Sequence, residues 1–212
     1  MEMYWTPYLV PLFLSASIVL TLLITSLRNR QETAAFVFSL TMLALLIWQV
    51  AYSFELAGGT LKYKLVWANV QFLGIGAAPV LWLIMTLRLI GMPPMKKGLV
   101  VLLFVIPIIT NILAWTDTVF HQLRSNPQLD VRPLIVLVQA NYGAWHNYIF
   151  VTYQYIMYGV SLILFIDARL KAKNIYKIRY NLLIFGMALP LVGSMLYVFG
   201  IPPFNNLNPT SM

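Results

Sequence analysis

Acids and histidines are the side chains of this sequence that could do chemistry, and both are few. Its 212 residues include six Asp and Glu, two His and no Cys. Without Cys, a thiolate metal site and a cysteine nucleophile are excluded. His121 and His146 lie far apart in one polar stretch and no other ligand-type cluster accompanies them, so we expect no metal site. No nucleophile, phosphate-loop or zinc motif is present, so we expect neither catalysis nor a cofactor in this segment.

Glu55 is the acid that best fits a functional role, because acids within membrane spans are rare and often functional. It shares one helical face with Trp48 and Tyr52. It also lies near a helix end, where it can reach water or pair with Lys62 or Lys64. A proton relay would need partners deeper in the apolar segments. The central parts of those segments contain no charged residue or His, which also excludes a retinal Schiff base.

Aromatic and polar side chains form similar stripes on the neighbouring apolar segments. Such a layer could line a ligand pocket that opens outward, with a few polar groups to orient the ligand. The candidate ligand-binding residues are Tyr52, Glu55, Trp67, Gln71, Asn111, Tyr148, Thr152, Tyr153 and Tyr155. Alternatively, the Tyr and Trp residues belong to an interfacial belt, and the small and polar residues only pack helices together. The sequence leaves both interpretations open.

The elements that position these side chains follow from the composition. Apolar residues make up 60% of the chain and charged residues only 9%, whereas soluble domains contain about 25% charged residues. Six apolar segments are each about long enough to cross a bilayer as a helix. They cover residues 8–27, 33–54, 65–90, 98–115, 147–166 and 180–200. The sequence therefore predicts an all-α polytopic membrane bundle of six transmembrane helices, with residues 1–212 as one domain.

Charges in alternate loops orient this bundle. Ten basic residues and two acids lie on one side, which therefore carries all of the net charge of +8. The basic residues are Arg28, Arg30, Arg88, Lys96, Lys97, Arg169, Lys171, Lys173, Lys177 and Arg179. The other side has four basic and four acidic residues. Because short cytoplasmic loops are rich in Lys and Arg, we expect a multi-pass cell-membrane protein with its N-terminus outside. The basic loop 167–179 favours contact with anionic lipid, or with a cytoplasmic partner.

The loop from Thr116 to His146 has a pattern of its own. Residues 131–138 are rich in β-branched side chains, and Asn141, Tyr142 and Gly143 then supply turn chemistry. A short β-hairpin over the outer mouth and an irregular loop both fit this pattern.

The order of these features resembles the seven-transmembrane N-terminal sensing region of bacterial and archaeal sensor histidine kinases. The matching residues are Trp48, Tyr52, Glu55, Leu56, Trp67, Gly74, Pro79, Trp82, Pro107, Thr110, Asn111, His121, Tyr142, Gly143, Tyr153, Tyr155, Gly159, Gly186 and Pro190. They span nearly the whole chain, although each motif is short. The resemblance implies a prokaryotic receptor for signal transduction in a two-component system. Its output would be a histidine kinase or cyclase domain.

Two features depart from that family. Residues 206–209 read Asn-Leu-Asn-Pro, where the family tends to have an Asp-Leu-Thr-Pro-like segment. The chain also ends at Met212, before any seventh helix. Six helices from an outside N-terminus end outside, whereas a kinase domain must be cytoplasmic. Either the chain is truncated before its seventh helix, which we expect, or it is a six-helix relative that has no fused output.

The sequence thus predicts a sensory input module that detects an extracellular or membrane-borne ligand and signals to a cytoplasmic kinase or cyclase. The expected partners are the lipid bilayer, a small ligand of unknown identity, a cytoplasmic signalling domain in cis or trans, and a second copy in a homodimer. Nucleic acid is not expected, because too few polar residues exist to build a solvated basic face. The alternative functions are a small membrane transporter or a membrane-protein assembly partner.

Overall fold

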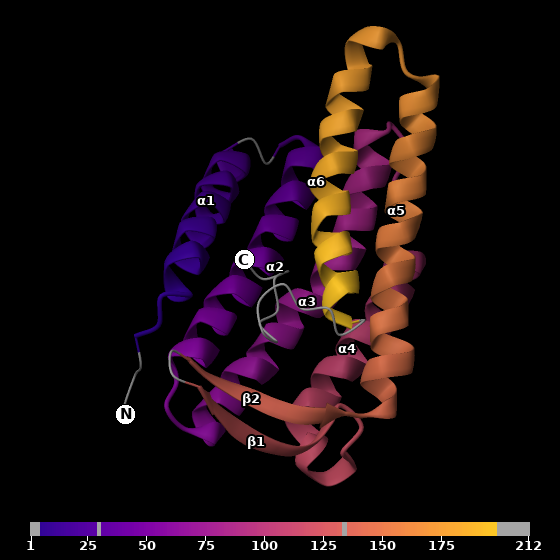
Figure 1. Cartoon of the computed structure of the whole chain (residues 1–212). Coiled ribbons are helices and arrows are strands. Elements are labelled where there is room, and N and C mark those ends of the chain that lie inside the picture. The colour runs from indigo at the N-terminus through magenta and orange to yellow at the C-terminus, as the bar shows by residue number, and fades with distance from the viewer. Residues whose placement is uncertain (1–4, 29–30, 133–134, 199–212) are drawn as a thin grey trace.

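The computed structural model describes residues 5–28, 31–132 and 135–198 and is mostly helical. Within these residues, long helices form a bundle and one antiparallel pair of strands lies across an end of it (Figure 1). In chain order the elements are α1 (Leu9–Arg28), α2 (Thr33–Ala57), α3 (Leu61–Leu89), α4 (Lys97–Phe120), β1 (Arg124–Arg132), β2 (Ile135–Tyr142), the π-helix η1 (Trp145–Phe150), α5 (Val151–Lys171) and α6 (Asn174–Val198). Each predicted apolar segment corresponds to one of these long helices.

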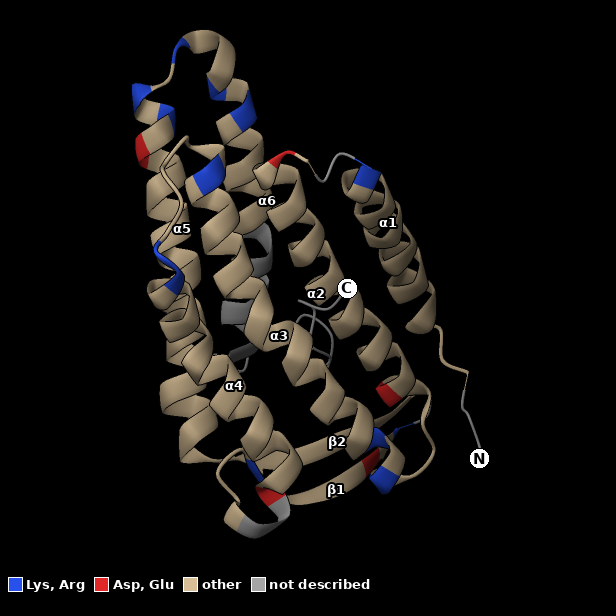
Figure 2. Ribbon diagram, turned by 180° about the vertical axis from the view of Figure 1, so that it is seen from behind, with Lys and Arg blue, Asp and Glu red and all other residues tan. Residues whose placement is uncertain are grey.

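The helices run along the long axis of the molecule, and most, but not all, neighbours in the chain pack side by side. α1 packs on α2 and α2 on α3, while α3 also contacts α4 and α5, and α6 packs on α5. The strands cover one end, which we call the hairpin end (Figure 1). At the opposite end α5 and α6 project beyond the other helices. Lys and Arg gather there, whereas the hairpin end carries both signs of charge (Figure 2), so we call it the basic end.

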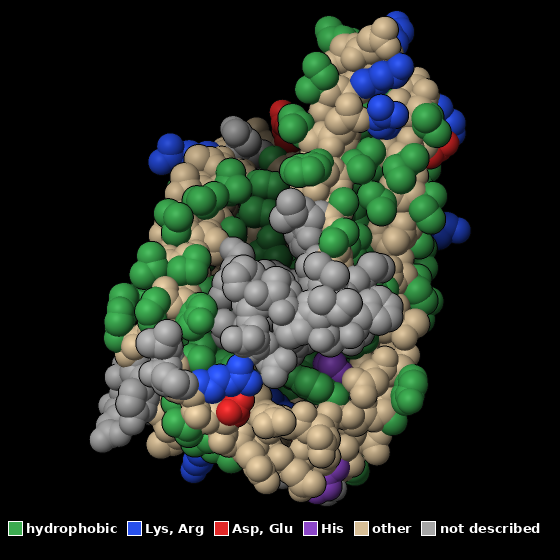
Figure 3. Space-filling model, viewed as in Figure 1, with side chains coloured by type: hydrophobic (Ala, Val, Ile, Leu, Met, Phe, Trp, Pro, Cys, Tyr) green, Lys and Arg blue, Asp and Glu red, His purple; other side chains and the backbone are tan. Residues whose placement is uncertain are grey.

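Five of the described helical segments are long and apolar enough to cross a membrane. They are Leu9–Arg28, Thr33–Ala57, Leu61–Leu89, Lys97–Asp117 and Trp145–Lys171. α6 occupies the place of the predicted sixth span but is not among these five, so the count of six spans is not confirmed. Many apolar side chains lie on the outer surface of the bundle (Figure 3). Lipid is the natural solvent for such a surface, because hydrocarbon tails cover it without cost.

Gly74 brings the backbones of α2 and α3 into direct contact. A Cβ atom added to Gly74 would lie 2.4 Å from the carbonyl oxygen of Ala44 and 2.8 Å from the backbone nitrogen of Trp48. Only glycine fits at this position. Small residues serve this purpose in membrane helices, because close backbone approach replaces the hydrophobic effect as the source of attraction.

The β-hairpin, one of two alternatives for the loop between the fourth and fifth segments, is confirmed. β1 and β2 pair antiparallel, with Arg132 opposite Ile135 and Arg124 opposite Tyr142. Asn141 and Tyr142, expected in a turn, instead end β2, and Gly143 follows them. Gly143 is needed here, because an added Cβ would lie 2.2 Å from the carbonyl oxygen of Gln122.

The helices at the basic end are longer than the apolar segments that predicted them. α5 continues to Lys171, where the ammonium of Lys171 lies 2.7 Å from the carboxylate of Asp167. α6 starts at Asn174 rather than residue 180. Hydropathy marks only the part of a helix inside hydrocarbon, and polar turns can continue the helix into the headgroup region.

Candidate functional site

A hydrogen bond between side chains joins α2 to α3 near the hairpin end. The amide of Gln71 on α3 donates to the carboxylate of Glu55 in the last turns of α2. Gln71 is buried and Glu55 is partly buried. A hydrogen bond between such side chains is stronger than the same bond in water, because the dielectric constant around it is low. It ties the end of α2 to the neighbouring helix α3.

Lys64 secures the end of α2 from the next helix. Its ammonium donates hydrogen bonds to the backbone oxygens of Glu55, at 2.6 Å, and Leu56, at 3.3 Å. These carbonyls lie in the last turn of α2, where helical partners run out; that of Glu55 also accepts a weaker hydrogen bond from the Gly58 amide, at 3.3 Å. α2 ends at Ala57, and the hydroxyl of Thr60 accepts a hydrogen bond from the Tyr63 amide to start α3. Because the connection between α2 and α3 is short, the side chain of Lys64 lies over the end of α2. It is fully buried there.

Asp117 ties the hairpin to the end of α4. Its carboxylate accepts hydrogen bonds from the backbone amides of Leu123, at 2.9 Å, and Arg124, at 2.8 Å. The guanidinium Nε of Arg124 lies 3.9 Å from the same carboxylate. Burial lowers the pKa of Arg124, and the negative charges of Asp117 and Glu55 oppose that shift. We name Glu55, Lys64, Gln71, Asp117 and Arg124 the polar cluster; its formal charges cancel.

Aromatic side chains surround the end of α2 on two sides. Phe54 stacks on Trp67 of α3 with ring centroids 4.5 Å apart. Tyr52 instead packs in a buried apolar cluster with Leu9 of α1 and Ile135 of β2. The last turns of α2 are therefore held by α1, α3 and the hairpin together.

Further hydrogen bonds join the helices on the other side of α3. The Asn111 amide on α4 donates to the Phe72 backbone oxygen of α3, at 3.1 Å, and to the Pro107 oxygen of its own helix, at 2.9 Å. The hydroxyl of Tyr153 on α5 donates to the Leu103 oxygen of α4, at 2.5 Å. In these bonds Asn111 and Tyr153 hold helices together, as the packing interpretation expects.

Comparison with protein families decides what kind of membrane bundle this is. The family model described as the N-terminal 7TM region of histidine kinase matches residues 11–212. The chain belongs to this family. No significant match to a curated protein was found. The resemblance seen in the sequence is thereby confirmed, and membership implies a bilayer and a cytoplasmic kinase domain as partners. The matched part of a histidine kinase is its membrane region and not a catalytic domain.

The nine candidate ligand-binding residues of this membrane region lie in three kinds of environment. Glu55, Trp67 and Gln71 come together where α2 meets α3, and Tyr52 packs against α1 and the hairpin. Asn111 and Tyr153 lie between helices, and Tyr155 is partly buried on α5. Tyr148 is 77% exposed on η1, and Thr152 is exposed on α5. Ligand binding by these nine residues stays a prediction.

The sequence did not indicate the roles of three members of the polar cluster in the kinase region. Lys64 was a candidate partner for the carboxylate of Glu55, but its hydrogen bonds go to backbone oxygens. Asp117 and Arg124 were only counted as loop charges. The sequence signal that could have found Asp117 is its position just after the end of the apolar segment 98–115, where unpaired backbone groups need a partner. In the described residues no three His, Asp or Glu side chains could hold a metal ion.

Proposed function

We propose that this region is the sensory input module of a membrane-bound histidine kinase and that the signal acts at the hairpin end. In this proposal the chain crosses the membrane six times from an N-terminus outside the cell, with the hairpin end outside and the basic end in the cytoplasm. A kinase or cyclase domain, on the same chain or another, reads the state of the bundle at the basic end. Residues 199–212 lie outside the described ones, so the expected truncation stays a prediction.

The single observation that carries the proposal is the hydrogen bond from Gln71 to Glu55. It is a polar contact between two membrane helices at the end that we place outside the cell. Polar and ionisable residues in such places are costly, and a functional role is the default explanation for them. A ligand that contacts Trp67, Tyr52 or the polar cluster would change how α2 packs on α3.

The mechanism that follows is a shift between two packings of the bundle. A ligand can shift such an equilibrium only by its difference in affinity for the two packings. Moving the populations from 1:99 to 99:1 requires a preference of about 5.5 kcal/mol. α2 and α3 run from the hairpin end toward the basic end (Figure 1). A change in their relative rotation would therefore be felt at both ends of the bundle.

A ligand screen by thermal shift tests the binding half of this proposal. The region is reconstituted in lipid nanodiscs and screened against extracellular small molecules. A ligand at about 100 times its Kd stabilises a protein by about 2.7 kcal/mol. Hits are then measured with Tyr52→Phe, Glu55→Gln and Trp67→Leu. We expect the shift to fall in these variants and to persist in the matched acid variant Asp130→Asn on the exposed hairpin. Equal shifts in all four proteins would contradict binding at this site.

A further inference from the structure

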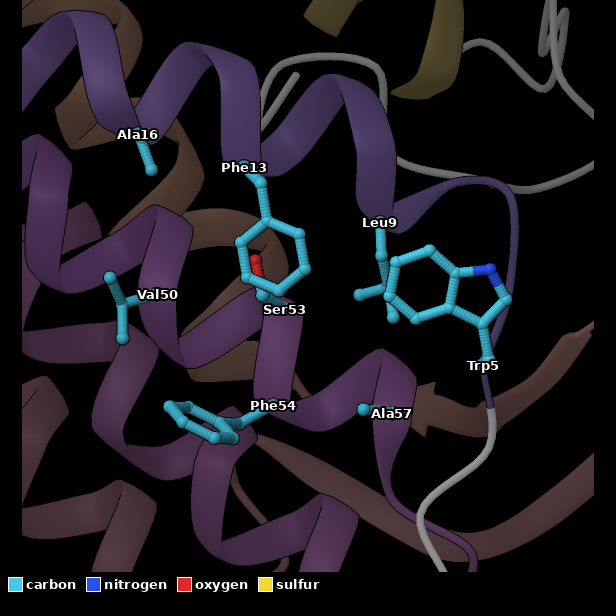
Figure 4. Close-up of a pocket in the computed structure, with 8 residues that line it drawn as sticks. All are labelled: Trp5, Leu9, Phe13, Ala16, Val50, Ser53, Phe54 and Ala57. Atoms are coloured by element: carbon cyan, nitrogen blue, oxygen red, sulfur yellow. The ribbon is translucent and has the colours of Figure 1, made fainter.

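A groove between α1 and α2 is lined almost entirely by apolar side chains. Phe13 of α1 points across it toward Ser53 of α2, Phe54 lies farther along α2, and Trp5 lies beside Leu9 at one end (Figure 4). Its volume is about 330 Å³, at the lower end of the ~300–1,000 Å³ range of small-molecule sites. The complete lining is Trp5, Leu9, Phe13, Ala16, Val50, Ser53, Phe54 and Ala57.

The chemistry of the lining favours a hydrocarbon chain as the occupant of the groove. The one hydroxyl in it, that of Ser53, already donates a hydrogen bond to the Gln49 backbone oxygen at 2.8 Å. No lining side chain carries a charge. A polar occupant would therefore lose its hydrogen bonds to water and gain few in return. An apolar chain loses nothing and gains close contact with two phenyl rings.

The position of the groove indicates that this hydrocarbon chain comes from the bilayer. Phe13 and Val50 belong to helices able to span the membrane, and they are 51% and 37% exposed. Their side chains border the groove, which is therefore open on a surface that lipid covers. Trp5 is 72% exposed and precedes α1 at the hairpin end. Trp at such a place is typical of the interface between headgroups and acyl chains.

The groove and the polar cluster share the same turn of α2. Phe54 lines the groove with one part of its ring and stacks on Trp67 of α3. The next residue, Glu55, bonds to Gln71. Whatever fills the groove therefore contacts the turn of α2 whose packing on α3 the proposed mechanism uses.

We propose that this groove binds one acyl chain of a membrane phospholipid from the leaflet at the hairpin end. The bound chain is then a membrane-borne input to α2. This proposal rests on the proposed function, because it assigns the occupant to the same sensory end.

Photo-crosslinking tests the proposal directly. The region is placed in nanodiscs of phosphatidylethanolamine and phosphatidylglycerol that contain a phospholipid with a diazirine in one acyl chain. After illumination, mass spectrometry maps the labelled residues. We expect label to concentrate on the groove lining, above the level on other lipid-facing residues. Label spread evenly over the exposed apolar residues of all helices would overturn the proposal.

A pair of variants separates the groove from the general lipid surface. Val50→Phe fills the groove, and Leu43→Phe introduces the same aromatic ring seven residues earlier on the same face of α2, outside the lining. We expect labelling of the groove to fall about tenfold, or about 1.4 kcal/mol, in Val50→Phe and to stay unchanged in Leu43→Phe. Equal labelling in both variants would overturn the proposal. Should Val50→Phe fail to fold, Ala16→Leu fills the groove from α1 and is tested instead.

A competition experiment identifies the source of the bound acyl chain. Excess unlabelled phospholipid should reduce the groove label, whereas competition by hexadecanoic acid alone would overturn the assignment to a bilayer lipid. The readout is binding and not kinase output, so its failure is distinct from failure of the proposed function. If only the lipid proposal fails, the groove is empty or holds another molecule, and the polar cluster still affects the kinase.

Discussion

Gln71 and Glu55, sixteen residues apart in sequence, are joined by a side-chain hydrogen bond that crosses from α3 to α2. The ammonium of Lys64 binds the backbone oxygen of the same Glu55, at 2.6 Å. One acidic residue is thus held at two points by the following helix. In the proposed mechanism, the end of α2 is the point where a contact at the hairpin end would change the packing of the helices.

Replacing Gly74 with alanine should separate α2 from α3. The added methyl carbon would lie 2.4 Å from a backbone oxygen of α2, which cannot move aside as a flexible side chain can. We expect a loss of roughly 1–3 kcal/mol, as for other overpacked cores, measured as a lower midpoint of thermal denaturation in detergent. Gly159→Ala is the matched control, because nothing lies within 4 Å of its added Cβ. Equal midpoints for the two variants would contradict the close contact.

Removing the Lys64 ammonium should destabilise the end of α2. Lys64→Met keeps most of the side-chain volume but leaves the carbonyls of Glu55 and Leu56 without these donors. The expected cost is about 1–3 kcal/mol, because the Leu56 carbonyl loses its Lys64 donor and the Glu55 carbonyl keeps only the Gly58 amide, at 3.3 Å. It is read from the same thermal denaturation. Lys62→Met is the control, because Lys62 is exposed two residues earlier on the same helix. Its effect should stay within about 0.5 kcal/mol.

Asp117→Ala should loosen the hairpin without unfolding the bundle. The backbone amides of Leu123 and Arg124 would lose their acceptor at the start of β1. We expect faster hydrogen exchange at these two amides and along β1, measured by mass spectrometry, because local opening becomes easier. Asp130→Ala removes an acid that only pairs with Arg132 on the hairpin itself. If exchange at the two amides is equally fast in both variants, Asp117 does not anchor the hairpin.

The helices could be predicted from the sequence because hydropathy and helix formation have one cause in a bilayer. Runs of apolar residues must be helical there to satisfy their backbone groups, so α1 is predicted to within one residue at each end. The start of α6 could not be predicted in this way, because residues 174–179 contain Asn, Lys and Arg and continue the helix outside the apolar segment. The hairpin was one of two alternatives, since β-branched residues also occur in irregular loops.

The contacts of the candidate site could be predicted only in part. Helical spacing placed Glu55 and Gln71 each on a polar stripe, but no periodicity states which stripe faces which helix. Spacing also put Tyr52 and Glu55 on one face of α2, although Tyr52 packs toward α1 and Glu55 bonds to α3. Partners between helices depend on the rotation of each helix, and close packing at Gly74 sets that rotation for α2 and α3.

The absence of Cys from the sequence makes orientation directly measurable. We expect Gln139→Cys, exposed on β2, to react with a membrane-impermeant maleimide in intact cells. Lys173→Cys, exposed between α5 and α6 at the basic end, should react only after the membrane is opened. The opposite pattern would place the hairpin end in the cytoplasm and contradict the positive-inside prediction.

Autophosphorylation of the kinase that contains this region tests the central claim most directly. The full-length protein is assayed in membrane vesicles with Gln71→Leu, which removes the donor to the Glu55 carboxylate. A hydrogen bond to a charged group contributes about 1.5–3 kcal/mol, so a bond made in only one packing changes the ratio of packings by about tenfold or more. We predict a change of that order in the phosphorylation rate, a smaller one in Glu55→Gln, and none in Asp130→Asn. Identical rates in all these proteins would show that contacts at the hairpin end do not reach the kinase.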